Sequence, residues 1–422
     1  MSPFAEKAAL VPLACVALAA CGGSETPGVS TAQPVKFDQF CAVADMKPAL
    51  RQTLVVIDAS AVRPSTPETF RSENAELLSL VTGVAEPTRA VSSGAMAPRE
   101  RLTISVADPV SGGLKQIFTG CVPGVSEQEL GERASKGEDG AAASYFGSDL
   151  QSKISEGGEA FWKQALLSLV QVKPSGAAPS GDGIKSVGVA RVFKSIGPSE
   201  PGVIRRVFVY TDAARGLNNI DKTAASVRAE GFRDAQQLQA DLGKADIHMV
   251  PAGRPLSDAQ GSYLDALLLG IQGNLRSFGP FSPNTLSKPP VKVLRYTGDL
   301  PLAANVRTPM EMQLAVAVDG SLVNSWISYT GSQGVRSTPV TGQFACAADA
   351  SCDLRGDPNM ALGQRWKTEM GTAAQPLPGG PFGGMRMISG KDDGQTFAGR
   401  IYDPIIYVGE RGDIRFTANK ME

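Results

Sequence analysis

The sequence has a single histidine and almost no net charge. His248 is the only histidine in 422 residues, which excludes a two-histidine zinc site and the HExxH helix of metalloproteases. At most one imidazole base is left for catalysis. The formal net charge is −1, and lysines and arginines form few clusters. Because nucleic-acid binding needs a basic patch or stripe, we expect no nucleic-acid partner.

The N-terminus carries an apolar run, AALVPLACVALAA, which follows Lys7 and ends at Cys21. The run is too short to span a membrane and has the length of a signal-peptide core, so residues 1–20 are predicted to be a signal peptide. The letters LAAC at 18–21 resemble the bacterial lipobox, which implies cleavage before Cys21 and lipidation of its thiol. A plain secretory signal with an unmodified cysteine is the alternative. The residue after the lipidated cysteine is Gly22 and not aspartate, which resembles the sorting pattern of outer-membrane lipoproteins. We therefore expect the protein to be anchored in the outer membrane and to face the periplasm or the cell surface.

Four cysteines remain beyond Cys21, namely Cys41, Cys121, Cys346 and Cys352. An even number in an exported chain predicts two disulfides. Cys346 and Cys352 are close in a polar stretch, so we expect them to pair with each other, which leaves Cys41 for Cys121. Free buried thiols are the alternative.

The composition of the mature chain changes along its length and predicts a tether, two domains and a linker between them. Residues 21–39 read as a lipidated tether rich in Gly, Ser, Thr and Pro. In 40–278, apolar strand-like runs alternate with helix-like stretches, which predicts an α/β domain whose mostly parallel sheet is covered on both faces. Residues 279–290 contain four prolines and are predicted to be a linker. Residues 291–422 follow a period of two, and Asp-Gly at 319–320 predicts a hairpin, so we expect a smaller antiparallel β-rich domain there.

Two of the predicted strands end in aspartate. Asp58 ends TLVVID, and Asp212 ends VFVYTD. In open α/β sheets, ligands bind at the carboxyl ends of the strands. Ser60 adds a hydroxyl, and carboxylates and hydroxyls are the ligands that Mg²⁺ and other hard cations prefer. The pattern predicts a divalent-metal site for Mg²⁺, Mn²⁺ or Ca²⁺. Alternatively, Asp58 and Ser60 only cap the following turn, because both residue types favour caps.

The first motif resembles the von Willebrand factor A domain, whose metal-ion-dependent adhesion site begins Asp-x-Ser-x-Ser after a strand. The resemblance covers 40–278 in the order of its segments and implies the same fold there. The ligands that it implies are Asp58, Ser60, Asp212, Ser180 and Asp182, the last two as replacements for the family's threonine. Val62 stands at the third motif position and cannot coordinate, so a water would take its place.

Together with the signal-like N-terminus, the resemblance leads us to expect an exported, lipid-anchored protein that binds a protein partner in the cell envelope, and no enzymatic activity. A carboxylate of the partner would complete the metal shell. A metal-independent envelope scaffold is the alternative. A hydrolase with Asp58 as nucleophile is disfavoured, because a haloacid-dehalogenase-type phosphatase needs a second aspartate where Ser60 stands. Asp182 likewise replaces the lysine of a phosphate-binding loop. His248 lies inside a predicted strand, where a packed histidine is the usual case.

Overall fold

The computed structural model describes residues 33–41, 49–86, 96–107, 113–125, 139–175, 188–198, 202–212, 217, 224–283, 286–303, 306–331, 334–348, 351–356, 387–402 and 413–421. Three predicted site residues, Cys21, Ser180 and Asp182, lie outside these ranges. No helix within them combines the length and the apolar character that crossing a bilayer requires.

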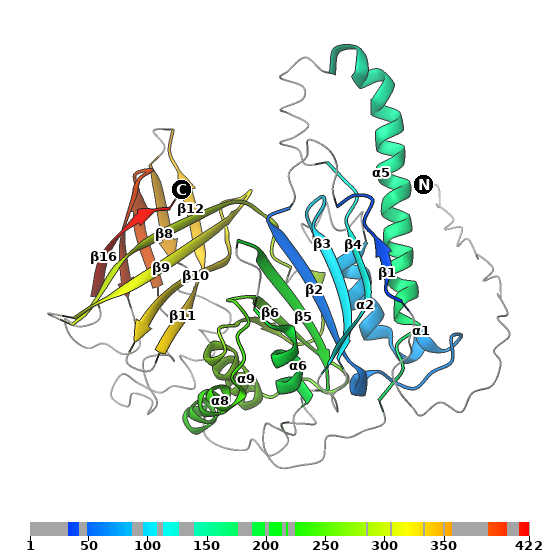
Figure 1. Cartoon of the computed structure of the whole chain (residues 1–422), viewed down its shortest axis with the longest axis horizontal. Helices are drawn as coiled ribbons and strands as arrows, with labels where there is room; N and C mark the ends of the chain where they lie inside the picture. Colours follow the sequence, from blue (N-terminus) through cyan, green and yellow to red (C-terminus); the bar gives the residue numbers. More distant parts are fainter. Residues whose placement is uncertain are drawn as a thin grey trace, which may run out of the picture. The chain divides into compact units, whose positions relative to one another are not determined.

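A seven-stranded sheet occupies the first part of the chain (Figure 1). Its strands, in order across the sheet, are β1 (Val35–Phe37), β4 (Leu114–Cys121), β3 (Arg101–Ala107), β2 (Arg51–Asp58), β5 (Ile204–Thr211), β6 (Asp246–Pro251) and β7 (Asn274–Phe278). All neighbours are parallel except β3 and β4. The chain runs from β2 outward to β3 and β4 on one side, and then continues from β5 on the other. The boundary between β2 and β5 is therefore a topological switch point.

Helices cover both faces of this sheet, as Figure 1 shows. One face carries α1 (Phe70–Glu73), α2 (Ala75–Ala85) and α5 (Asp139–Leu169), and the other carries α6 (Gly188–Ile196), α8 (Ala224–Leu238) and α9 (Asp258–Gly270). Val55 and Ile57 of β2 pack on the α2 and α5 side, whereas Val56 packs on the α6 and α8 side. All three are fully buried, which explains why this strand reads as one continuous apolar run.

The second sheet is antiparallel and has nine strands. Its order is β11 (Gly334–Val340), β10 (Leu322–Gly331), β9 (Val306–Ala317), β8 (Pro290–Ala303), β16 (Asp413–Lys420), β15 (Thr396–Tyr402), β14 (Met387–Asp392), β13 (Cys352–Gly356) and β12 (Gly342–Cys346). The sheet nearly closes, because Phe344 N–H donates to the Gly320 carbonyl at 2.8 Å. The Asp-Gly hairpin is confirmed: it joins β9 to β10, and Gly320 has a φ of +78°.

The predicted fold class, a von Willebrand factor A-like α/β chain followed by a smaller antiparallel β-rich domain, is wrong. Strands make up 44% of the structure and helices 26%. The antiparallel sheet has nine strands, against seven in the mostly parallel sheet. Strands β12, β13 and β14, with the sequences GQFAC, CDLRG and MISGKD, contain glycine, aspartate and lysine, which are depleted in strands. Their alternation is too weak to reveal them in the sequence.

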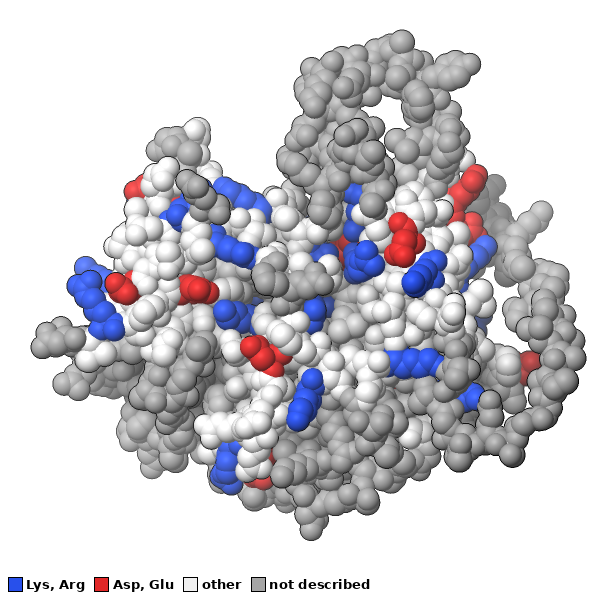
Figure 2. All heavy atoms as spheres, viewed as in Figure 1, with Lys and Arg blue, Asp and Glu red and all other residues white. Residues whose placement is uncertain are grey.

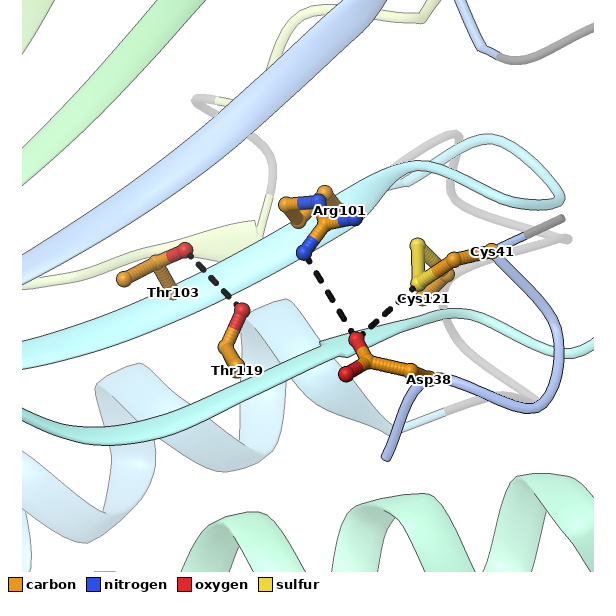
Figure 3. The surroundings of a disulfide bond; sticks show 6 residues. All are labelled: Asp38, Cys41, Arg101, Thr103, Thr119 and Cys121. Carbon is orange, nitrogen blue, oxygen red and sulfur yellow. Dashed lines mark hydrogen bonds and ion pairs between the residues drawn. A yellow bond between two sulfur atoms is a disulfide. The ribbon is translucent and has the colours of Figure 1, made fainter. Parts of the chain in front are cut away.

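Both predicted disulfides are confirmed. The sulfur atoms of Cys41 and Cys121 are 2.12 Å apart, and those of Cys346 and Cys352 are 2.08 Å apart. The first bond ties the turn after β1 to the end of β4. Figure 3 shows it beside the ion pair of Asp38 and Arg101, whose atoms are 3.6 Å apart. That ion pair is exposed and contributes little to stability.

The proline-rich segment (279–290), predicted as a linker, packs on the seven-stranded sheet through its described residues. The Phe281 ring lies against Gly83 of α2, where an added Cβ would be only 2.2 Å from it. It also makes an edge contact with Phe208 of β5, with the ring centroids 6.2 Å apart. Leu286 is 8% exposed. The segment thus packs against α2 and β5 on the face of the sheet that carries α2 and α5.

A cluster of buried charged side chains holds this segment in place. Glu100 accepts hydrogen bonds from Arg51 through both carboxylate oxygens, at 3.0 and 3.1 Å. Arg51 Nη1 in turn donates to the carbonyls of Ser287 and Lys288, at 3.1 and 3.2 Å. Arg206 Nη1 donates to the Ser287 carbonyl at 3.4 Å. The proline-rich segment therefore supplies acceptors for both arginines.

The cluster combines two cations with one anion. Thr53 Oγ1 accepts from Arg206 at 3.0 and 3.1 Å and donates to Glu100 at 2.5 Å. Burial lowers the pKa of Arg206 to about 9, and the charge of Arg51 acts in the same direction. Burial alone would raise the pKa of Glu100, but the charges of Arg51 and Arg206 outweigh it and lower that pKa. Glu100 thus supplies compensating negative charge to both arginines, and Asp246 adds to it for Arg206.

Glu100→Gln is expected to lower the free energy of unfolding by about 3–5 kcal/mol, because it removes the buried carboxylate that Arg51 and Arg206 share. Urea unfolding measures this. The control is Glu159→Gln, which removes one partner of an exposed pair with Lys163 and is expected to cost less than about 1 kcal/mol. Equal losses in the two variants would contradict the role given to Glu100.

His248 is packed inside β6, as the sequence predicted, and is 3% exposed. Its Nδ1 is 2.8 Å from Ser277 Oγ, and its ring stacks on Phe208 with centroids 4.7 Å apart. Its Nε2 is buried and has no hydrogen-bond partner among the described residues. Burial lowers the pKa of His248 well below its ordinary value, and the charges of Arg206 and Arg276 act in the same direction.

Stability is expected to fall below about pH 6.5, where the histidine of the unfolded chain binds a proton that the native His248 does not. The loss approaches about 1.4 kcal/mol per pH unit and stops at the lowered native pKa. Urea unfolding between pH 7.5 and 5 measures it. Since the chain has no second histidine, His248→Gln should remove the slope. An unchanged slope in that variant would refute the assignment.

Polar contacts also join the two sheets. Asp246 at the start of β6 accepts from Arg276 Nε at 2.8 Å and from the backbone N–H of Asn324 at 2.9 Å. Asn324 has a φ of +41° and lies at an irregularity in the pairing of β10 with β9. Lys244 Nζ is 3.7 Å from the centroid of the Trp326 ring, a cation–π contact.

Candidate functional site

The predicted site lies where β2 and β5 end side by side. Ile57 pairs with Tyr210, so Asp58 is level with Thr211. Thr211 Oγ1 donates a hydrogen bond to Asp58 Oδ2 at 2.8 Å. Asp212 follows directly and is half-buried. The structure therefore places Asp58 and Asp212 at the same carboxyl edge, next to the switch point.

The Asp58 carboxylate is buried and fully engaged. It is 3% exposed, and its Oδ1 accepts from the backbone N–H of Ser60 at 2.9 Å and from Ser60 Oγ at 2.7 Å. Asp58 thereby caps the short 3₁₀ helix η1 (Ala59–Ala61). Asp58 therefore has the capping role that was the alternative to metal binding. With Thr211 on the other oxygen, Asp58 orients two hydroxyl groups, one from η1 and one from β5.

A second Asp-x-Ser sequence in the chain shows what the motif does by itself. In the β9–β10 turn, Asp319 Oδ1 accepts from the N–H and the Oγ of Ser321 at 3.1 and 2.6 Å. Asp319 lies in an exposed turn, so these two hydrogen bonds follow from local turn chemistry. Asp58 differs in being buried and in receiving Thr211 from a neighbouring strand.

Acidic groups surround this edge. Burial raises the pKa of Tyr210 to about 12, and the negative charges of Glu76 and Asp212 act in the same direction, while Arg63 opposes them. Glu76 Oε2 accepts from the backbone N–H of Gly253 at 3.1 Å. The edge therefore offers oxygen acceptors and a negative potential, which suit a cationic group.

The described residues do not form a metal site by themselves. Within the ranges that the structure covers, no group of three or more His, Cys, Asp or Glu side chains is placed to hold an ion. The Asp58 oxygens already accept three hydrogen bonds, and the apolar Val62 is 3% exposed. Ser60, Thr211 and Asp212 offer the oxygens that a hard cation prefers, but too few charged ones. With Ser180 and Asp182 outside the described residues, the metal stays a prediction.

The sequence did not predict the residues whose side chains hydrogen-bond across β2 and β5 at the two ends of these strands. Thr211 stands one position before Asp212, and a hydroxyl as the last strand residue was the available signal. The strands β2 and β5 are mostly apolar but contain three buried polar residues, Arg51, Thr53 and Arg206. Polar residues at such positions indicate that buried hydrogen-bond partners exist, but the sequence does not show which residues these partners are. Their anion, Glu100, comes 49 positions after Arg51.

No protein-family model matches the chain, and no curated protein matches it.

Proposed function

We propose that this chain is an exported, lipid-anchored binding protein that recognises a protein partner in the cell envelope through the carboxyl edge of its seven-stranded sheet. One observation carries the proposal: Asp58 orients the hydroxyls of Ser60 and Thr211 beside Asp212 at the switch point. Switch points are where open α/β sheets bind their ligands. The resemblance of the Asp58 motif to an adhesion site favours a protein ligand.

The chemistry of the edge favours binding over catalysis. Ser60 donates its hydrogen to Asp58, so its oxygen lone pairs are free to accept from a ligand. Thr211 is 1% exposed and supports Asp58 from within the sheet. With the half-buried Asp212 carboxylate, Ser60 makes an acceptor surface for a lysine or arginine of the partner. Three accepted hydrogen bonds weaken Asp58 as a nucleophile, which argues against the hydrolase alternative.

Export is supported by three independent features. The signal-like N-terminus and the LAAC sequence favour a lipid anchor at Cys21. The tether that follows suits a domain held away from a bilayer. The two disulfides favour an oxidising compartment such as the periplasm or the cell surface.

Asp212→Asn is expected to weaken capture of the partner at least about tenfold, the loss for one charge-assisted contact. The measurement is a pull-down with the tagged lipoprotein from envelope extract. Asp212 is half-buried, so the variant should fold. Asp319→Asn, at the other Asp-x-Ser turn, is the matched control and should bind as wild type. Undiminished capture by Asp212→Asn, or an equal loss in the control, would contradict the proposal.

A partner contact bridged by a divalent ion is the second candidate, favoured by the lone pairs of Ser60 and the half-buried carboxylate of Asp212. In that case Mg²⁺ or Mn²⁺ raises the melting temperature of wild type, and the shift is lost in Asp58→Ala; at 100 times Kd the ion adds about 2.7 kcal/mol. Chelator should then release the partner in the pull-down. Capture that survives chelator, with no thermal shift, would rule out the bridging ion and leave the direct contact at Asp212, or a metal-independent scaffold if Asp212→Asn also captures the partner.

A further inference from the structure

The disulfide of Cys346 and Cys352 lies at the turn end of the hairpin that β12 and β13 form. The two cysteines are directly opposite each other in the register, and the Ala347 N–H donates to the Ser351 carbonyl across the turn at 2.8 Å. Five pairs of residues join the two strands. The disulfide therefore adds a covalent link to strands that are already joined by their backbones.

Cys346 is open to a thiolate, the species that attacks a disulfide. Residues 345–348, with the sequence ACAA, are all exposed, and the side chains beside Cys346 are small and uncharged. Cys352 is only 3% exposed and lies opposite the buried Asp392 in the pairing of β13 with β14, where a carboxylate repels a thiolate. Basic and acidic side chains are interspersed over the face drawn in Figure 2, so access and the nearest charges guide a thiolate. Attack is therefore expected at Cys346.

The disulfide of Cys41 and Cys121 is less open to attack. Cys121 is 3% exposed, and Cys41 is partly buried. Asp38 Oδ1 is 3.5 Å from the Cys41 sulfur, as Figure 3 shows, so an approaching thiolate meets a negative charge. Arg101 pairs with the same oxygen at 3.6 Å and offsets part of that charge. Burial therefore protects this bond, and Asp38 adds to the protection.

The two bonds also differ in how much of the fold depends on them. Cys346 and Cys352 are 6 positions apart, whereas Cys41 and Cys121 are 80 apart. In the chain-entropy model, the stabilisation by a disulfide grows with the length of the loop that it closes. Opening the short loop should therefore leave the chain folded, whereas opening the long one releases the turn after β1 from the end of β4.

We propose that Cys346–Cys352 is a site of thiol–disulfide exchange, which a dithiol protein of the exported compartment opens in the folded chain while Cys41–Cys121 stays closed. One thiolate of the dithiol attacks the Cys346 sulfur and forms a mixed disulfide, and the electron pair of the broken bond leaves with the Cys352 sulfur. The second thiolate of the dithiol then attacks its own first sulfur and releases Cys346. The dithiol is oxidised to a disulfide, and its two protons pass to the two cysteines. The inference is independent of the candidate site at Asp58.

The test exposes the full, folded chain to dithiothreitol and follows both bonds by timed alkylation and mass spectrometry. Cys346 and Cys352 are expected to be alkylated at least about tenfold faster than Cys41 and Cys121, because a thiolate reaches the exposed Cys346 directly. Circular dichroism of the same samples should show a folded chain after the first bond has opened. Equal rates, the reverse order, or unfolding that accompanies the first opening would overturn the proposal.

A pair of variants tests whether the attack takes place at Cys346. Ala347→Glu adds a carboxylate next to it and is expected to slow the opening of this bond at low ionic strength, because like charges repel. Ala347→Gln has nearly the same size without the charge and is the matched control. The opening of Cys41–Cys121 should be the same in both variants. Equal rates of Cys346 alkylation in the Glu and Gln variants would contradict attack at Cys346.

Discussion

The buried cluster of Arg51, Thr53, Glu100 and Arg206 is the interaction on which the rest of the structure depends. Glu100 accepts two hydrogen bonds from Arg51 and lies 3.5 Å from Arg206, so its negative charge serves both arginines. The remaining guanidinium donors reach the carbonyls of the proline-rich segment (279–290). That segment leads directly into β8, so the cluster also fixes where the antiparallel sheet begins.

The same cluster sets the register of the two strands that carry the candidate site. Arg206 contacts Thr53 at the amino end, and Thr211 contacts Asp58 at the carboxyl end. Both contacts join residues 153 positions apart, so a single register satisfies them together. A slip of one residue would turn every inward side chain of β5 to the other face. The buried charges at one edge thus specify the hydroxyl–carboxylate arrangement at the other.

Local features of this fold could be predicted from the sequence, because local chemistry determines them. The apolar run before Asp58, the strand around His248 and the Asp-Gly turn at 319–320 each depend on neighbouring residues. Both cysteine pairings followed from spacing and elimination. The strand count could not be predicted, because β12 to β14 have weak strand character and are held by their partners. The proline-rich composition of 279–290 indicated a linker, and nothing local shows that its carbonyls serve Arg51 and Arg206.

If Glu100 holds both the proline-rich segment and the β2–β5 register, its loss loosens both, and amide hydrogen exchange measures this in each segment. Peptides covering 279–290 and 203–212 are compared in wild type and Glu100→Gln, under conditions where both remain folded. The account predicts that both peptides exchange faster in the variant while peptides from β9 and β10 keep their protection. Unchanged protection of 203–212 in Glu100→Gln would contradict it, since the carboxyl edge would then be ordered without the cluster.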